Sequence, residues 1–425
     1  MVSKPHSIHI PKRSVIRETL ANGTTLLYAP NPENQIVAIR IGTHLASQHE
    51  PADKAGMANL CMRLLAAGTD HSTEEEISDR LEQNGAHYKA EAGKDWSPID
   101  LLTTAEAVEQ DLETILETID CPTFAPDKIE REQDVVHMNI LEQEDSHLTL
   151  TLRLFRQHYF GSHPYAWPSI GRLETIDQIE REDLVRFAHA AFDPSQLLVT
   201  VVGGTEDRVL PLLQKYFGQR TPRDAEPILS PPPVCSAITT DTEILEQRET
   251  EAEYIVLGYP GASIGQPEAM PLRIISAILG GSMDSRLFRE IRDNRGLCYQ
   301  IGSSYAPAHD HSPLLIYIVT SPQNRHEAVA CAQAEVRRLQ EELVGNEELD
   351  RVKTYVNGTF VMAMETNMGQ ASHYAAYEMA GLGWQFTNQF PEAIQAVTPE
   401  QIRETAQRLF THRLLTITAP PDTDD

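Results

Sequence analysis

The stretch GMANLCMRLLAAGT, residues 56–69, is the part of the sequence from which the fold of the whole chain can be inferred. Its apolar residues recur at intervals of three and four, which predicts a helix with one buried face. These residues are Met57, Leu60, Cys61, Leu64 and Leu65. Gly68 follows them, as expected of a glycine that ends a helix. Positions 59 and 63 lie one turn apart on the polar side, so their side chains can reach a common point.

A helix can present two histidines at such positions to a zinc ion, with a glutamate beside them as general base. Here the two positions hold Asn59 and Arg63, and the position that suits the base holds Met62. A guanidinium is always charged and only donates hydrogen bonds, so it cannot ligate a cation. A thioether takes no proton from water. We therefore expect no zinc at this helix.

The frame around these residues resembles that of the M16 peptidases, the group of insulysin, pitrilysin and the mitochondrial processing peptidase. Their signature is G-x-A-H-x-x-E-H-x-x-x-x-G-T, which contains the inverted zinc motif H-x-x-E-H. The positions that match the frame are Gly56, Ala58, Gly68 and Thr69. The three motif residues map onto Asn59, Met62 and Arg63, so all three are lost while the spacing is kept.

The resemblance covers nearly the whole chain and extends to further short segments in the family's order. These are Leu20–Gly23, Ala46–Glu50, His163–Tyr165, Phe192–Pro194 and Gly280–Ser282. The resemblance implies an α+β fold of two tandem homologous domains, each a mainly antiparallel sheet with helices packed on one face.

Two more departures lie in the first half of the chain. The third zinc ligand of active M16 members is a glutamate further along, and its position falls on Asn139. Active members resemble N-A-x-T on the strand that holds the peptide backbone, and here that place reads Lys89-Ala90-Glu91-Ala92. The resemblance therefore implies a first half without zinc chemistry and with an altered substrate edge.

The second half retains the pair Arg292 and Tyr299. It resembles the arginine–tyrosine pair that M16 enzymes use in the half opposite the zinc, and that the metal-free chain supplies in two-chain members. A guanidinium can donate to a peptide carbonyl, and a phenol can donate to a developing oxyanion. Taken by themselves, the arginine could instead cap its own helix and the tyrosine could simply pack.

The organisation of the chain fits two domains. A proline-rich stretch at residues 221–240 is typical of a stiff linker and divides the chain into 1–220 and 241–425. A helical pattern followed by a strand occurs in both halves, with Tyr88 and Tyr299 at corresponding places about 210 positions apart, which indicates a duplication. Strands are predicted at Thr25–Tyr28, Val37–Ile41, Ile99–Leu102, Leu197–Val202, Tyr254–Tyr259, Leu314–Val319 and Leu414–Ile417. Helices are predicted at 108–119 and 328–339, and the segment 365–384 has a helical but otherwise uninformative composition.

Composition limits the function further. The net charge of -27 argues against a nucleic-acid partner and fits either general solubility or an acidic inner surface for basic peptides. The five scattered cysteines are expected to be reduced thiols. No apolar run is long enough to cross a membrane, and residues 1–13 lack the apolar core of a secretion signal, so we expect a cytoplasmic protein.

Other polar groups are assigned structural roles. His309, Asp310 and His311 are expected to form a solvated loop, because two histidines in a turn have no third ligand in view. His158 and His163 are expected to be structural, and Cys298 to be a small packing residue.

The leading hypothesis is thus an M16B-type non-catalytic subunit. A zinc-bearing M16 homologue with H-x-x-E-H would supply the metal, and this chain would supply Arg292, Tyr299 and half of a chamber for short or unfolded peptides. The alternative is a catalytically dead structural or peptide-binding protein, which could be a homodimer.

Overall fold

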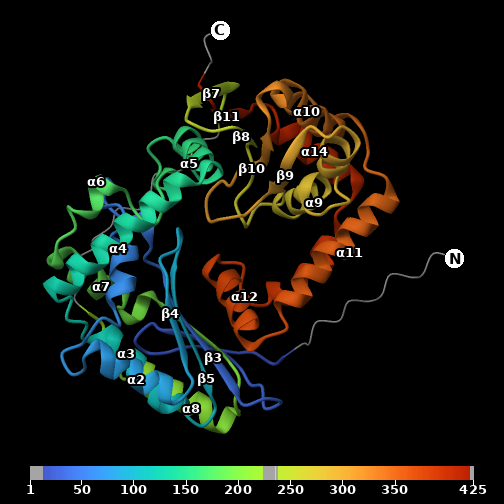
Figure 1. Ribbon diagram of the computed structural model, residues 1–425. Coiled ribbons are helices and arrows are strands. Elements are labelled where there is room, and N and C mark those ends of the chain that lie inside the picture. The colour runs from blue at the N-terminus through green and yellow to red at the C-terminus, as the bar shows by residue number, and fades with distance from the viewer. Residues whose placement is uncertain (1–12, 224–234, 236–237, 422–425) are drawn as a thin grey trace.

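The computed structural model describes residues 13–223, 235 and 238–421 (Figure 1). Residues 1–12, which bear on the secretion signal, and most of the predicted linker, 224–234 and 236–237, lie outside the described residues. None of the helices in the described ranges is both long and apolar enough to span a bilayer.

The first half contains a six-stranded sheet in the order β1-β2-β6-β3-β5-β4. Its strands are β1 (Ile16–Thr19), β2 (Thr25–Ala29), β3 (Ile36–Thr43), β4 (His87–Ala90), β5 (Ser97–Thr104) and β6 (Leu197–Val202). All neighbouring pairs are antiparallel except β2 and β6, which run parallel. The short strand β4 forms one edge.

The second half contains a five-stranded sheet in the order β7-β11-β8-β10-β9. Its strands are β7 (Thr242–Gln247), β8 (Glu253–Tyr259), β9 (Cys298–Ser304), β10 (Leu314–Thr320) and β11 (Leu414–Ala419). The pair β7 and β11 is parallel and the others are antiparallel, so the sheet repeats the arrangement β2-β6-β3-β5-β4. Tyr88 on β4 and Tyr299 on β9 thus occupy equivalent edge strands, as the sequence repeat predicts.

Helices follow the strands in the same order in both halves. The first half has α1 (Met57–Leu64), α2 (Glu74–Gln83), α3 (Val108–Asp120), α4 (Pro126–Asp145), α5 (His147–Phe160), α6 (Leu173–Ile176), α7 (Arg181–Ala191) and α8 (Glu206–Gly218). The second half has α9 (Ala269–Gly280), the π-helix η5 (Phe288–Asn294), α10 (Arg325–Glu341), α11 (Asn346–Ala363), α12 (Asn367–Met379), α13 (Phe386–Ala396) and α14 (Pro399–Leu409). Short 3-10 turns lie at η1 (Ser47–His49), η2 (Ala52–Lys54), η3 (Pro164–Ala166), η4 (Pro194–Gln196) and η6 (Pro322–Asn324).

Alternate residues of the strands face opposite sides of each sheet. On β2, Leu26 and Tyr28 pack with the helices of the first half, whereas Leu27 and Ala29 pack with residues of the second half. Each half therefore covers one face of its own sheet with its own helices. The fold class predicted from the sequence, α+β with two tandem domains, is confirmed.

The second face of each sheet receives a helix from the other half. Helix α12 lies against β3 and β6, and α5 lies against β8 and β11 (Figure 1). Phe155 and Tyr159 of α5 are buried with Val256 and Leu414 of the second sheet. Because α5 and α12 occupy the same place in the two repeats, the exchange is reciprocal.

The predicted strands are all present, and α3, α10 and α12 confirm the predicted helices. One detail is wrong: α1 ends at Leu64, four residues before Gly68. Gly68 instead pairs with Thr73 in an isolated bridge, with φ 136°, so it shapes the turn towards α2.

The loop around His309 joins the two halves, whereas the sequence suggested a solvated turn. The backbone N–H of His309 donates to Asp95 Oδ2 at 3.0 Å, and that of Asp310 donates to the Tyr165 hydroxyl at 3.4 Å. Asp310 Oδ2 lies 3.4 Å from Nε2 of His163. Asp95 also accepts the hydroxyl of Tyr165. The β9–β10 loop is therefore tied to the first half close to η3.

Candidate functional site

The start of α1 is fixed by close backbone packing and by a buried carboxyl group. Gly56 has φ 101°, and a Cβ there would lie 2.6 Å from Ile176 Cδ1, so a larger residue would not fit. The Glu50 side chain accepts the backbone N–H groups of Gly56 at 2.9 Å and of Ala58 at 2.6 Å. Burial raises the pKa of Glu50 to about 7. Glu50 thus caps the helix that carries positions 59, 62 and 63.

The three positions of α1 that would serve zinc chemistry hold unsuitable groups. Met62 is fully buried in the core of the first half. Nδ2 of Asn59 is buried and has no hydrogen-bond partner in the part of the chain that the structure describes. Arg63 forms an ion pair with Glu132 of α4, with Nε at 3.0 Å and Nη2 at 2.8 Å from the same carboxylate oxygen, Oε2.

Glu132, which the sequence analysis did not single out, is the carboxylate that α4 presents to α1. It lies seven residues before Asn139, which is two turns of helix, so both residues lie on nearly the same face of α4. The spacing shows that Glu132 shares a face of α4 with Asn139, but not that this face meets Arg63. Asn139 itself is partly buried.

Glu132 belongs to a chain of ion pairs that links α1, α4 and α2. Its second oxygen, Oε1, lies 3.3 Å from Nη2 of Arg131, which also contacts Glu74 of α2 at 2.9 Å. Lys128 lies 2.6 Å from Glu74. Arg131 and Lys128 lower the pKa of Glu74 to about 2. A groove of about 690 Å³ begins beside this chain and is lined by Ala66, Glu74, Ile77, Ser78, Leu81, Glu82, Gly85, Ala86, His87 and Tyr88.

These side chains do not fit a zinc ion. Structural and catalytic zinc sites use imidazole, thiolate and carboxylate ligands, at least three from the protein. Here the one carboxylate, Glu132, pairs with Arg63, and the side chain of Asn59 is an amide in place of an imidazole. The described residues contain no group of three or more His, Cys, Asp or Glu side chains that could hold a metal.

Lys89 lies on the edge strand β4, opposite Asp100 of β5. Its ammonium forms an exposed ion pair with Glu91 at 2.6 Å. The edge of the first sheet therefore carries an exposed charged side chain at the place predicted to hold the peptide backbone.

Tyr299 lies at an irregularity of the second sheet's edge strand. The pairing of β9 with β10 shifts so that Cys298 faces Thr320 and Gln300 faces Val319, which leaves Tyr299 as the extra residue of a bulge. Bulges bend a strand and re-aim side chains, and they often lie beside active sites. The Tyr299 side chain is 62% exposed. It is therefore not the packing tyrosine of the alternative interpretation.

Arg292 lies on η5, directly before this strand, and is exposed. Its guanidinium lies 4.8 Å from the ring centre of Phe288, a cation–π contact that holds the side chain without using its hydrogen-bond donors. Burial raises the pKa of Cys298, the residue before Tyr299, to about 11. The charge of Arg292 acts against this rise, which shows that the guanidinium is near. Arg292 and Tyr299 thus flank the same strand start, with their polar atoms accessible.

The predicted site residues therefore fall into two groups. Arg63 of α1 contacts Glu132 of α4, and Asn59 lies one turn before Arg63 on α1, whereas Arg292 and Tyr299 lie on the other half. No hydrogen bond or ion pair among the described residues joins the two groups.

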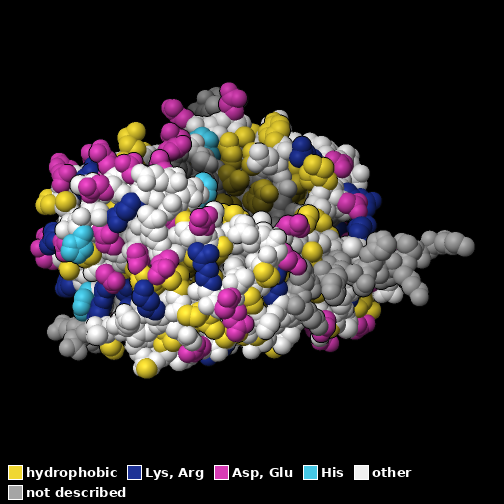
Figure 2. Space-filling view, turned by 90° about the horizontal axis from the view of Figure 1, so that it is seen from below, with side chains coloured by type: hydrophobic (Ala, Val, Ile, Leu, Met, Phe, Trp, Pro, Cys, Tyr) yellow, Lys and Arg dark blue, Asp and Glu magenta, His cyan; other side chains and the backbone are white. Residues whose placement is uncertain are grey.

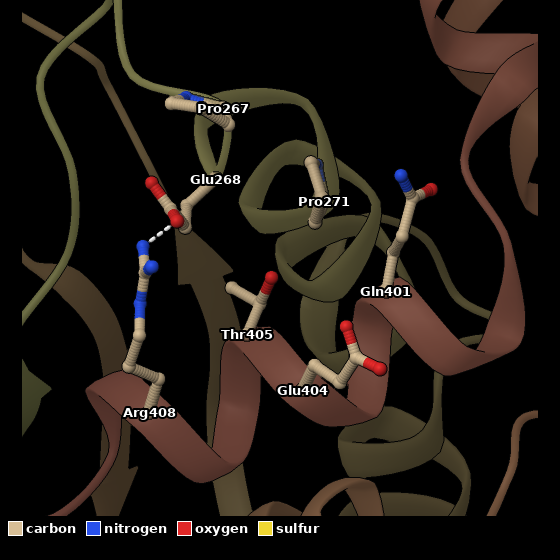
Figure 3. A pocket seen from close by; sticks show the side chains of 7 residues that line it. All are labelled: Pro267, Glu268, Pro271, Gln401, Glu404, Thr405 and Arg408. Carbon is tan, nitrogen blue, oxygen red and sulfur yellow. Dashed lines mark ion pairs between the residues drawn. The ribbon is translucent and has the colours of Figure 1, made fainter.

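The surface is hollowed between the halves. Figure 2 shows hydrophobic side chains gathered in this hollow, with Asp and Glu side chains spread over the surrounding surface. A separate cavity of about 300 Å³ lies at the outer end of the second half, between the start of α9 and α14. An ion pair between Glu268 and Arg408 closes one side of it, and none of the predicted site residues lines it (Figure 3).

The chain is a duplicated α+β protein. Its first half has a helix in the place of the zinc motif, and its second half has an exposed arginine–tyrosine pair. These features are those of the two-domain insulinase-like peptidases. Residues 25–167 match the family model described as insulinase (peptidase family M16), and residues 178–356 match that described as the peptidase M16 inactive domain. The chain belongs to the M16 peptidase family.

Its relatives support the same family along the full length. A protein of Bacillus subtilis named uncharacterized zinc protease YmxG is 23% identical over 93% of this chain and 95% of its own. An uncharacterized zinc protease of Rickettsia bellii is 24% identical over 92% of this chain and 94% of its own.

Solved structures show the same fold. A protease from Helicobacter pylori superposes with a TM-score of 0.87 at 21% identity, covering 96% of this chain and 100% of that one. A peptidase M16 inactive domain from Pseudomonas fluorescens gives a TM-score of 0.87 at 20% identity, covering 97% of this chain and 99% of that one.

Proposed function

We propose that this chain is the non-catalytic subunit of a heteromeric M16 zinc peptidase. A homologue with an intact H-x-x-E-H motif would bind the zinc and supply the activated water. This chain would contribute Arg292 and Tyr299 and one half of the chamber in which short or unfolded peptides are cut. We further propose that the complex acts in the cytoplasm.

The observation that supports this proposal is the contrast between the two halves. The first half has an arginine ion pair where a metal would be bound, whereas the second half keeps Arg292 and Tyr299 exposed at a bulged strand edge. A purely structural chain has no need to keep both donors accessible.

The two side chains suit peptide hydrolysis. The Arg292 guanidinium can donate to a carbonyl of the bound peptide and so position it. The Tyr299 hydroxyl can donate to the oxyanion that forms when water attacks the scissile carbonyl. A hydrogen bond that strengthens in the transition state raises kcat. A contact made equally in the bound substrate and in the transition state mainly changes KM.

The test is a mixture of this chain with the zinc-bearing homologue from the same host. We expect Tyr299→Phe to lower kcat of the mixture by about 100-fold, in line with the loss of one oxyanion donor. Arg292→Ala should lower kcat/KM with a large change in KM. Peptide hydrolysis by each mixture, measured over a range of peptide concentrations, gives both constants.

Arg289→Ala is the matched control for Arg292. Arg289 lies on the same helix η5 and is exposed, but it pairs with Asp284 at 3.5 Å. Its variant should leave kcat/KM unchanged. If the Arg292 and Tyr299 variants also leave it unchanged, the proposed role is wrong.

Native mass separates this proposal from the alternative of a dead, homodimeric binding protein. In an extract of its own host, the proposed complex has about twice the chain's 47.5 kDa and contains the zinc-bearing homologue. A complex of the same mass that holds two copies of this chain and no homologue supports the alternative.

A further inference from the structure

At the place that would hold zinc, this chain offers hydrogen-bond donors in place of the lone pairs that ligate a metal. Zinc needs lone pairs that point inwards, but Asn59 directs a buried N–H₂ group that has no acceptor among the described residues. Buried donors are nearly always hydrogen-bonded, to protein or to a bound molecule. The Asn59 amide thus offers a donor that an acceptor on a bound molecule could use.

Arg63, one turn further along α1, adds donors to the same side. Both of its contacts go to a single oxygen of Glu132, through Nε and Nη2. Its Nη1 group makes no hydrogen bond within the described ranges, and 32% of the side chain is exposed. A planar guanidinium with free N–H groups is well suited to a carboxylate.

The charges around this point favour an anion. The connected ion pairs join three cations to two carboxylates, which leaves one positive charge in excess; the members are Arg63, Arg131, Lys128, Glu132 and Glu74. This excess stands out in a chain of net charge -27. A neutral carbonyl would satisfy the donors but would not use the charge.

The neighbouring groove offers room for the rest of such a ligand. Ala66, which lines it, lies one turn after Arg63, and Glu74, which also lines it, belongs to the same chain of ion pairs. The groove has a volume of about 690 Å³, which is room for several small residues of a peptide.

We propose that Asn59 and Arg63 form a binding site for a peptide carboxylate, at the place where active relatives bind their metal. The carboxylate belongs either to the C-terminus of the peptide or to an acidic side chain. The site belongs to this chain alone, so it does not depend on the proposed partner.

The experiment measures peptide binding to the full chain without any homologue. The probe is a nonapeptide of glycine, serine and alanine with an uncharged BODIPY dye at its N-terminus, made with a free C-terminal carboxylate, as the C-terminal amide, and as the amide with one internal glutamate. Fluorescence anisotropy at low salt gives the three affinities. We expect the free-carboxylate or the glutamate peptide to bind about tenfold more tightly than the plain amide, and the stronger of the two identifies the source.

Arg63→Gln and Asn59→Ala should each remove most of this preference. Arg80→Gln is the matched control, because Arg80 is 33% exposed and pairs with Glu117 at 3.0 Å, outside the ion pairs of Arg63. The Arg80→Gln variant loses a comparable ion pair but should keep the preference for the carboxylate peptide. Arg63→Lys, which keeps the charge without the planar fork, should retain part of it and shows that loss of binding is not loss of folding.

Equal affinity of the wild-type chain for all three peptides would overturn the proposal, as would a preference that survives Arg63→Gln. Neither result bears on Arg292 and Tyr299, whose test needs the zinc-bearing homologue and measures hydrolysis.

Discussion

Glu132 and Asn139 lie on nearly the same face of α4, and the structure places Glu132, not Asn139, in contact with position 63. The sequence was sufficient to identify the degenerate positions of α1, because the spacing of small residues around them is intact. It was not sufficient for Glu132 or Glu50, since their partners are far along the chain or in the backbone. Such contacts depend on how α1 packs against α4, which no local pattern encodes.

A designed metal site tests the placement of Glu132. The triple variant Asn59→His, Met62→Glu, Arg63→His supplies two imidazoles and a base, and we expect it to bind one zinc ion per chain with Glu132 as the third ligand. Adding Glu132→Gln should weaken zinc binding by more than about tenfold, while adding Asn139→Gln should not. Competition with a chelating dye measures the affinities, and the opposite ranking would restore Asn139 to the predicted role.

At the scale of elements, the strands were predictable because each combines β-branched and apolar residues in a short run between turns. The helical character of α12 was predicted, but its place was not, because the helix is buried on several sides between the first sheet and the second half. Its small and polar residues give no single apolar stripe. The sequence likewise could not predict that α5 and α12 each pack on the sheet of the other half. An apolar face predicts that a helix is buried, but it does not identify the surface that covers it.

Gly258 on β8 shows how closely the exchanged helix α5 approaches the second sheet. A Cβ at this position would lie 2.2 Å from Cζ of Phe155. We expect Gly258→Ala to lower the free energy of unfolding by about 1–3 kcal/mol, because the aromatic ring has no room to move in a packed core. Urea denaturation followed by circular dichroism measures the change.

Gly358→Ala provides the control. Gly358 lies within α11, and nothing stands within 4 Å of an added Cβ. This variant should raise the free energy of unfolding by about 0.5–1 kcal/mol, because alanine favours the helix. Equal stability of the two variants would show that α5 does not bear on Gly258 in solution.

At the scale of the molecule, histidines gather where the β9–β10 loop meets the first half. Burial lowers the pKa of His44 and of His49 below 6.5, and the nearby His309 adds to the effect on both. Asp95, Asp310 and His163 form the contact itself. The loop thus lies close to two histidines whose pKa values are lowered.

We expect this contact to weaken as the pH falls. Above pH 6.5 both histidines are neutral in the closed and open states, so the contact has its full strength. Below that value the open state takes up protons first, because the closed state holds the pKa values lower. Amide hydrogen exchange of residues 305–313, corrected for its intrinsic pH dependence, should therefore be faster at pH 5.5 than at pH 7.5.

Glu50 acts in the opposite direction. Its pKa of about 7 means that the folded chain takes up a proton there as the pH falls, which stabilises that state. Glu50→Gln should therefore reduce the gain in the free energy of unfolding between pH 7 and pH 4.5, which urea denaturation measures. The double variant His44→Gln, His49→Gln should flatten the loop's response to acid. A loop response that is unchanged in the double variant would exclude the two histidines as its cause.

During synthesis on the ribosome, the first sheet emerges long before α12 can cover its second face. Leu27, Ala29, Leu198 and Val202 belong to that face, and α12 begins at Asn367, about 165 residues after β6 ends at Val202. At about 5–20 residues per second, the nascent chain exposes this apolar surface for about 10–30 s. The first half therefore cannot bury this face of its sheet before α12 has been translated.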